Sequence, residues 1–196
     1  MAFGFVLVGG LSTRMGRDKA LLPLGGVPMA LLQARKLERV CGRVAFVGKE
    51  PGPFTALGYP FVTDLSAERA ALHGLLAALE WSPEGLNVVL AADVPHVPEA
   101  LLGALLARLE ASGGPAIVPT AAGHPQPLCA AWSKGSLSAL RLAVAEGDLS
   151  LRRAVEATRA LVLSEEETAL LPGFAGGAFR NVNTPEEYRA AEEEIA

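Results

Sequence analysis

The sequence predicts an α/β fold in which helices flank a mostly parallel central sheet. Short, β-rich apolar runs alternate with longer helical stretches, which is the pattern of such folds. The chain has 196 residues, of which 51% are hydrophobic and only 19% are charged, a composition that excludes a disordered protein. That length fits one ordinary domain with a continuous core. Because no repeat or low-complexity linker divides the chain, we expect residues 1–196 to form a single domain.

The N-terminal half contains four expected strands and three expected helices. Residues 3–8 are nearly all apolar, as in a central strand covered on both faces. A glycine-rich loop follows over 9–26, and Pro28 then opens a helix. The expected strands are 3–8, 44–47, 59–63 and 87–92, and the expected helices are 28–41, 66–81 and 98–112.

The C-terminal half continues the alternation with shorter elements. We expect helices at 136–147 and 150–157, and extended segments at 116–119, 127–132, 159–163 and 178–182. Thr184-Pro185-Glu186-Glu187 supplies a capping hydroxyl, a proline at the first helical position and a glutamate three residues on. This is a capping box, so a last helix should begin at Pro185.

Charge and cysteine content exclude several classes of partner. The net charge of −4 disfavours nonspecific nucleic-acid binding, which relies on a basic surface. The apolar runs are all shorter than the ~18 residues that span a bilayer. Cys41 and Cys129 lie far apart and form no disulfide framework. We therefore expect a cytoplasmic protein with neither nucleic acid nor membrane as a partner.

The most informative stretch is the loop after the first strand, where open parallel sheets bind their ligands. Its glycines, Gly9 and Gly10, remove Cβ atoms so that backbone N–H groups can converge on an anion. Arg14 and Lys19 add positive charge suited to a polyphosphate. The stretch matches neither the P-loop nor the dinucleotide fingerprint. A plain surface turn with scattered basic residues is the alternative interpretation.

Two aspartates follow expected strands directly. Asp93 ends the strand at 87–92 and Asp64 ends the strand at 59–63. Carboxylates at the carboxyl ends of parallel strands face the ligand crevice, and Mg²⁺ is commonly held by one or two carboxylates plus phosphate oxygens. Aspartate also caps turns, so these residues alone leave both roles open.

The whole N-terminal string resembles the signature of the molybdenum cofactor guanylyltransferase family, within the nucleotidyltransferase superfamily. The matching residues are Leu7, Gly9-Gly10, Arg14-Met15-Gly16 and Asp18-Lys19, and the similarity continues through 21–28. Asp93-Val94-Pro95, the stretch 124–128 and Asn181-Val182-Asn183-Thr184-Pro185-Glu186 match later family elements. The resemblance covers nearly the whole chain, although 135–177 carries no diagnostic motif.

The resemblance implies a three-layer αβα Rossmann-like nucleotidyltransferase fold, with the nucleotide in the N-terminal part and an acceptor pocket completed by the C-terminal part. It implies a catalytic set of Arg14, Lys19 and Asp93, with Mg²⁺ on Asp93. It implies a nucleotide-binding set of Leu7, Val8, Gly9, Gly10, Lys19, Asp64 and Asp93. Asn181 and Asn183 are the expected acceptor-binding residues, although asparagines at a helix entry also satisfy backbone groups.

The reaction implied by the resemblance is transfer of GMP from GTP to the phosphate of molybdopterin, with release of pyrophosphate. Molybdoenzymes or their chaperones are the protein partners it suggests, by transient contact. A cytidylyltransferase or sugar-phosphate nucleotidyltransferase with the same loop, and a non-catalytic nucleotide-binding adaptor, remain alternatives. Gly9-Gly10 favours guanine, since related cytidylyltransferases tend to carry Leu-Ala-Ala-Gly. Two departures are Val8, where the family usually has alanine, and Val47-Gly48-Lys49, where it tends to have a polar residue such as asparagine.

Overall fold

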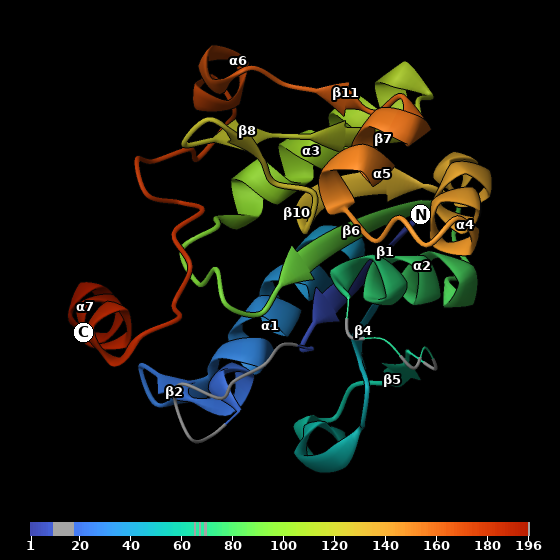
Figure 1. Cartoon of the computed structure of the whole chain (residues 1–196). Helices are drawn as coiled ribbons and strands as arrows, with labels where there is room; N and C mark the ends of the chain where they lie inside the picture. Colours follow the sequence, from blue (N-terminus) through green and yellow to red (C-terminus); the bar gives the residue numbers. More distant parts are fainter. Residues whose placement is uncertain (10–17, 65, 67, 69, 196) are drawn as a thin grey trace.

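The fold is built around a seven-stranded sheet. The computed structural model describes residues 1–9, 18–64, 66, 68 and 70–195. The strand order is β11-β7-β10-β6-β1-β4-β5 (Figure 1). All neighbouring strands are parallel except β10, which runs antiparallel to both β6 and β7. The strands are β1 Ala2–Leu7, β4 Val44–Gly48, β5 Phe61–Thr63, β6 Leu86–Ala91, β7 Ala116–Val118, β10 Cys129–Ser133 and β11 Leu161–Val162. This confirms the predicted α/β fold with a mostly parallel sheet.

Helices cover both faces of this sheet, which gives the predicted three layers. Side chains that alternate along β1 and β6 pack against α1 and α3 on one face and against α2, α4 and α5 on the other. The helices are α1 Met29–Cys41, α2 Ala71–Trp81, α3 Glu99–Ser112, α4 Leu137–Ala145 and α5 Leu151–Thr158. Among the described residues, no helix is long and apolar enough to cross a bilayer.

Helix α1 lies unusually close to strand β1 because Gly4 has no side chain. A Cβ atom at Gly4 would come within 2.8 Å of the Cβ of Leu37. The helix begins after Pro28 and ends at Gly42, which has a φ of +79°. The close approach fixes α1 along β1, β4 and β6, beside the ends of the strands that carry the predicted site.

Two segments differ from the expected elements. The extended segment expected at 178–182 forms no strand: Ala178 and Phe179 lie in turns, in which Ala178 N donates to Ala175 O and Arg180 N to Gly177 O. These turns use the backbone groups that a strand would need. The helix expected from residue 66 begins only at Ala71, and the carbonyls of Ser66 and Glu68 before it accept from Lys49 Nζ instead of from helical N–H groups.

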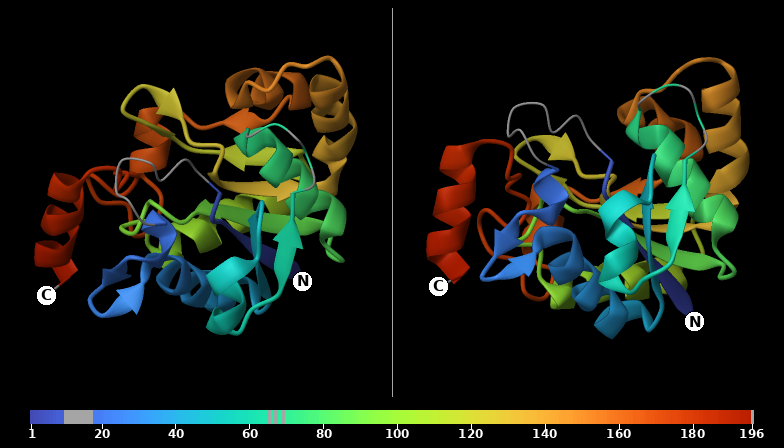
Figure 2. Two further views of the ribbon diagram at one scale, coloured as in Figure 1. Left: turned by 60° about the horizontal axis from the view of Figure 1, so that its bottom comes forward. Right: turned by 90° about the horizontal axis from the view of Figure 1, so that it is seen from below.

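The last part of the chain returns to the carboxyl end of β6. Helix α6 (Glu165–Ala169), which sequence reasoning missed, is followed by turns and then by α7 (Pro185–Ile195). The predicted capping box is confirmed: Glu187 N donates to Thr184 Oγ1, and Thr184 N donates to Glu187 Oε2. Figure 2 shows α7 beside the small hairpin formed by β2 (Pro23–Leu24) and β3 (Val27–Pro28).

Short elements complete the fold. Hairpin strands β8 and β9 extend from the sheet near α6, and among the described residues three short 3₁₀ helices lie in connections. Their bounds are β8 Thr120–Ala121, β9 His124–Pro125, η2 Lys19–Leu21, η3 Gly52–Leu57 and η4 Lys134–Ser136.

Candidate active site

Two neighbouring parallel strands, β1 and β6, end at a small cavity of about 160 Å³. Ala92 N donates to Leu7 O, which keeps the two strand ends together beyond the last paired residues. Small side chains form much of the wall, so backbone atoms are close to any ligand. The cavity is lined by Leu7, Val8, Gly9, Asp18, Lys19, Ala20, Ala71, Ala91, Ala92, Asp93 and Leu128.

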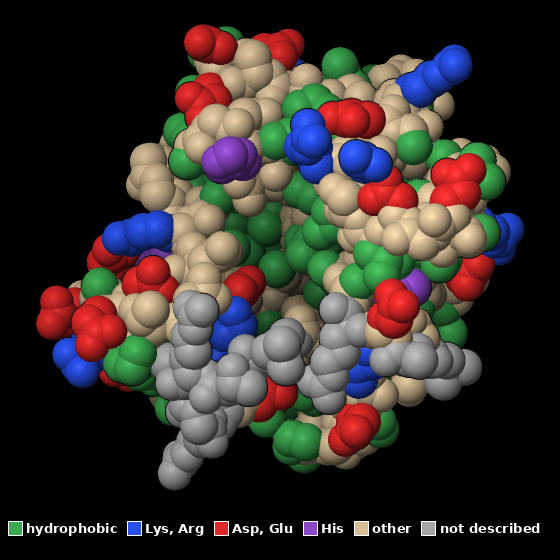
Figure 3. Space-filling model, in the orientation of Figure 1, with side chains coloured by type: hydrophobic (Ala, Val, Ile, Leu, Met, Phe, Trp, Pro, Cys, Tyr) green, Lys and Arg blue, Asp and Glu red, His purple; other side chains and the backbone are tan. Residues whose placement is uncertain are grey.

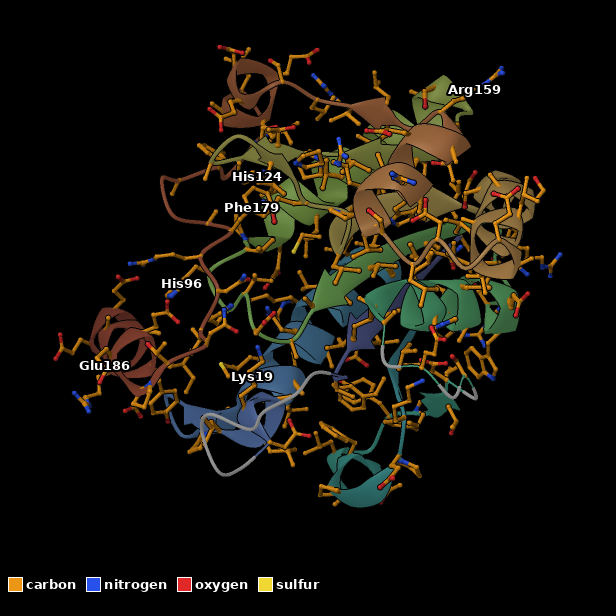
Figure 4. All side chains as sticks on the ribbon, in the orientation of Figure 1. Lys19, His96, His124, Arg159, Phe179 and Glu186 are labelled. Atoms are coloured by element: carbon orange, nitrogen blue, oxygen red, sulfur yellow. The ribbon has the colours of Figure 1, made fainter. Side chains whose placement is uncertain are left out.

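Lys19 is the central charged group at this cavity (Figure 4). Its Nζ donates to Asp93 Oδ2 and to Asn183 Oδ1, each at 2.6 Å. The side chains of Lys19 and Asp93 are both only 20% exposed. Three residues predicted from separate stretches of the sequence therefore meet at one ammonium group.

The local backbone explains why Lys19 points this way. Lys19 opens the short helix η2, and Asp18 caps that helix by accepting from Ala20 N at 3.0 Å. Burial raises the pKa of the Asp18 carboxyl, an effect opposed by that backbone hydrogen bond and by neighbouring Lys19. Asp18, which belongs to the matched signature but received no predicted role, thus orients the lysine.

Residues 181–183, which contain the two asparagines expected to bind the acceptor, are held against the Asp93 loop by backbone hydrogen bonds. Val182 N donates to Asp93 O at 2.8 Å, and Asn183 N donates to Glu187 Oε2 at 2.6 Å. These bonds set the Asn183 amide toward Lys19. Asn181 is exposed and does not line the cavity, so the structure does not bring it to the Lys19–Asp93 pair.

Asp64 also lies apart from this cavity. Its side chain is 7% exposed, with Oδ2 at 2.9 Å from Lys49 Nζ and Oδ1 accepting from Ser66 N. Lys49 Nζ donates further to the carbonyls of Ser66 and Glu68. Those carbonyls are the reason that α2 starts late. The departure noted at Lys49 is therefore an ion pair that fixes the Asp64 carboxylate.

The predicted residues thus divide into three sets. Leu7, Val8, Gly9, Lys19 and Asp93 line one cavity, and Asn183 contacts it through Lys19. Asp64 and Asn181 lie outside it. Gly10 and Arg14 lie outside the described residues.

Sequence reasoning missed two polar residues on α1, Gln33 and Lys36, which contact the loop that carries Asp93. For Gln33, the sequence contains a pattern that could have indicated such a contact. Gln33 falls on the buried apolar face of α1, between Ala30 and Leu37, where a polar residue needs a buried partner.

A second and larger cavity of about 490 Å³ lies between the β8–β9 hairpin, α6 and the turns before α7. Its walls include Phe174 and Phe179, with Glu165 and Arg180 as charged groups. Glu165 Oε1 accepts from Gly123 N at 2.5 Å, which ties α6 to the hairpin. Figure 3 shows that this face of the molecule is hollowed near its centre, with hydrophobic side chains in the hollow. His124 is exposed and does not line the cavity.

The fold and the site define the class of protein. A mostly parallel sheet with helices on both faces, a cavity at the ends of β1 and β6, and a lysine–aspartate pair at its edge describe a nucleotide-binding α/β enzyme. The chain belongs to the family described as the MobA-like NTP transferase domain, which matches residues 4–162.

Relatives and solved structures agree with this assignment. The molybdenum cofactor guanylyltransferase of Cereibacter sphaeroides is 34% identical over 97% of this chain and 95% of that protein. That of Rhizobium meliloti is 34% identical over 95% of this chain and 88% of that protein. The molybdopterin-guanine dinucleotide biosynthesis protein A of Archaeoglobus fulgidus superposes with a TM-score of 0.83 at 26% identity, over 99% and 98% of the two chains. The Thermus thermophilus 2-C-methyl-D-erythritol 4-phosphate cytidylyltransferase shares the fold, with a TM-score of 0.68 at 17% identity over 97% and 96%.

Proposed function

We propose that this protein transfers GMP from GTP to the terminal phosphate of molybdopterin and releases pyrophosphate. The observation that carries the proposal is the position of the Lys19 ammonium, between the Asp93 carboxylate and the Asn183 amide at a cavity that ends β1 and β6. The relatives that this chain matches over nearly its full length are molybdenum cofactor guanylyltransferases, which supports the choice of substrates.

The nucleotide occupies the N-terminal side of the site. Backbone groups of Leu7, Val8 and Gly9 hold the base, and Gly10, Arg14 and Lys19 hold the phosphates. Asp64, which follows β5, is the further nucleotide contact, and Lys49 at the end of β4 keeps its carboxylate in one orientation. The roles of Gly10 and Arg14, which lie outside the described residues, follow from the family signature alone.

Asp93 is the proposed magnesium ligand. Its carboxylate is partly exposed at the cavity, and it is the kind of oxygen donor that Mg²⁺ prefers. The described residues contain no cluster of three His, Cys, Asp or Glu side chains that could hold a metal by themselves. One carboxylate plus phosphate oxygens is the usual arrangement for magnesium–nucleotide sites. When bound, the ion would neutralise negative charge on the triphosphate.

The reaction needs no covalent enzyme intermediate. An oxygen of the acceptor phosphate attacks the α-phosphorus in line, and the bond from that phosphorus to the bridging oxygen breaks with pyrophosphate as the leaving group. The acceptor phosphate is already a nucleophile, so the protein contributes position and charge. Lys19 contributes the positive charge that balances the charge on the α-phosphate and the departing pyrophosphate.

The acceptor occupies the C-terminal side, so that one domain over residues 1–196 carries both substrates. Asn183 and Asn181 bind the pterin or its phosphate through their amides. The cavity of about 490 Å³ has the size of ordinary small-molecule sites, and its aromatic walls suit a flat ring system. Transient contact with molybdoenzymes or their chaperones would then remove the product, in the cytoplasm.

Two measurements test the proposal. The first is pyrophosphate release from GTP, CTP or UTP in the presence of molybdopterin and Mg²⁺, for which we expect release with GTP. The second is the thermal stability gained with each nucleotide; a ligand at about 100 times its Kd adds about 2.7 kcal/mol. Release with CTP instead would favour a cytidylyltransferase, whose fold this chain shares. Stabilisation by GTP without any pyrophosphate release would favour a non-catalytic adaptor.

A further inference from the structure

Helix α1 holds the backbone of the loop that carries Asp93. Gln33 is completely buried, and its Nε2 donates to Val94 O at 2.6 Å and to Ala91 O at 3.4 Å. These two carbonyls lie on either side of Asp93 in the chain. An amide NH₂ can donate twice, and both acceptors of this nitrogen are carbonyls at the Asp93 loop.

One turn further along α1, Lys36 extends the same contact. Its Nζ donates to Val97 O at 3.0 Å and also to Pro95 O. Burial lowers the pKa of Lys36 to about 8, an effect that nearby Glu99 opposes. The ammonium therefore lies in a poorly solvated place and has the carbonyls of the loop as its partners.

On the opposite side, Val182 N binds Asp93 O. The backbone carbonyls of Ala91, Asp93, Val94, Pro95 and Val97 are thus all engaged. A loop fixed at this many points has little freedom, so the direction of the Asp93 side chain is set before any ligand arrives.

Packing alone does not require these two polar residues. Burying an amide or an ammonium costs free energy, and well-packed apolar side chains of similar volume often stabilise a core as well or better. Lys36 is half-buried, and apart from Gln33 the fully buried residues of α1 are apolar: Met29, Ala30, Ala34 and Leu37. The polar pair therefore serves the loop rather than the core.

We propose that Gln33 and Lys36 are positioning residues that fix the Asp93 loop from α1, so that the Asp93 carboxylate is held toward Lys19 and the magnesium–nucleotide. This inference rests on the proposed function, because a fixed carboxylate matters only if it takes part in binding the metal and phosphates. A misplacement of about 1 Å at a reacting centre can cost about 10²-fold in rate.

The test compares Gln33→Met and Lys36→Met with wild type, with Lys36→Arg as the conservative variant and Arg35→Ala as a control on the exposed side of α1. For each protein we would measure the rise in Tm with GTP in EDTA and with GTP plus Mg²⁺. If the two residues have a merely structural role, each variant has a lower Tm with and without ligand. The rise in Tm with GTP in EDTA and the rise with GTP plus Mg²⁺ then both stay as in wild type. We expect the two Met variants to lose most of the extra increment that Mg²⁺ gives, while Lys36→Arg and Arg35→Ala keep it.

Steady-state kinetics provide a second measurement. For the Met variants we expect kcat to fall about 10- to 100-fold and KM for magnesium–GTP to rise as well, because a misplaced Asp93 carboxylate weakens both metal binding and the alignment of the reacting groups. Where a Met variant does not fold, Gln33→Leu or Lys36→Leu, which likewise lacks a donor to the loop carbonyls, takes its place with the same expected result.

The possible outcomes separate the two proposals. Met variants that keep the wild-type magnesium increment and kcat, in a protein that binds GTP, would overturn the positioning role and leave the proposed function intact. If Mg²⁺ adds nothing to the rise in Tm that GTP gives in the wild-type protein, the proposed function is overturned, and the positioning role with it.

Discussion

Replacing Lys19 by alanine should separate catalysis from folding. The change removes two hydrogen bonds of 2.6 Å, to Asp93 and to Asn183. Hydrogen bonds to charged groups contribute about 1.5–3 kcal/mol each when well buried, but these side chains are 20% exposed, and water recovers part of that. Val182 N still holds Asp93 O. We expect a net loss of about 1–2 kcal/mol, or about 2–8 °C in Tm for a chain of this size.

The effect on turnover should be larger. Removal of one charged group that stabilises a transition state costs about 10²–10³ in rate, which corresponds to about 2.7–4 kcal/mol. The assay is pyrophosphate release from GTP and molybdopterin, at a temperature where circular dichroism shows Lys19→Ala still folded. Under those conditions the lost turnover cannot come from unfolded protein.

Arg39→Ala is the matched control, because it also removes an ion pair. The Arg39–Glu99 pair is largely exposed, with side chains 59% and 38% accessible, so its loss should cost below about 1 kcal/mol and leave turnover unchanged. A Lys19→Ala protein with turnover within about threefold of wild type would refute the role of Lys19. A loss of activity that merely follows a loss of folded protein would refute it as well.

Three further predictions concern stability and thiol chemistry. Gly4→Ala should destabilise the protein by about 1–3 kcal/mol in urea unfolding, because the added Cβ would lie 2.8 Å from the Cβ of Leu37 on α1. Gly103→Ala, in open space within α3, should instead stabilise the protein by up to about 1 kcal/mol. Equal effects of the two changes would contradict this packing. Burial raises the pKa of the Cys41 and Cys129 thiols to about 12, so a thiol reagent at pH 8 should modify them only after denaturation, and fast labelling of the folded protein would argue against it. Burial lowers the pKa of Lys36 to about 8, so between about pH 8 and pH 10.5 the unfolded chain keeps a proton that the folded chain has lost. The unfolding free energy of wild type, measured relative to that of Lys36→Met, should therefore rise with pH over this range. A difference that stays constant or falls would disprove this prediction.

Much of the fold could be predicted because local pattern and global structure agree. The apolar runs that became β1, β4 and β6 are buried on both faces, as parallel strands require. The capping box at Thr184 begins α7 where the sequence indicates. The Lys19–Asp93 pair was also predictable as a shared site, since both residues follow strands whose carboxyl ends meet at one edge.

The two errors have different causes, one a contact between separate segments and the other a pair of local turns. No local signal shows that Lys49 draws the carbonyls of Ser66 and Glu68 away from a helix. The turn at Gly177, with a φ of +88°, replaces the first part of the extended segment expected at 178–182, and Asn181 is exposed. A tertiary contact overrode local preference at the start of α2, whereas local turn hydrogen bonds did so at 178–179.

The Lys19–Asn183 contact joins positions 164 residues apart. Asn183 reaches the lysine only while α7 rests on the β2–β3 hairpin, through a small cluster that includes Leu24, Met29, Val182 and Ala191. Small peripheral clusters open at lower free energy than a central sheet. Warming or mild denaturant should therefore detach α7 and the Asn183 segment first. Enzyme activity should be lost while amide hydrogen exchange still shows an intact central sheet.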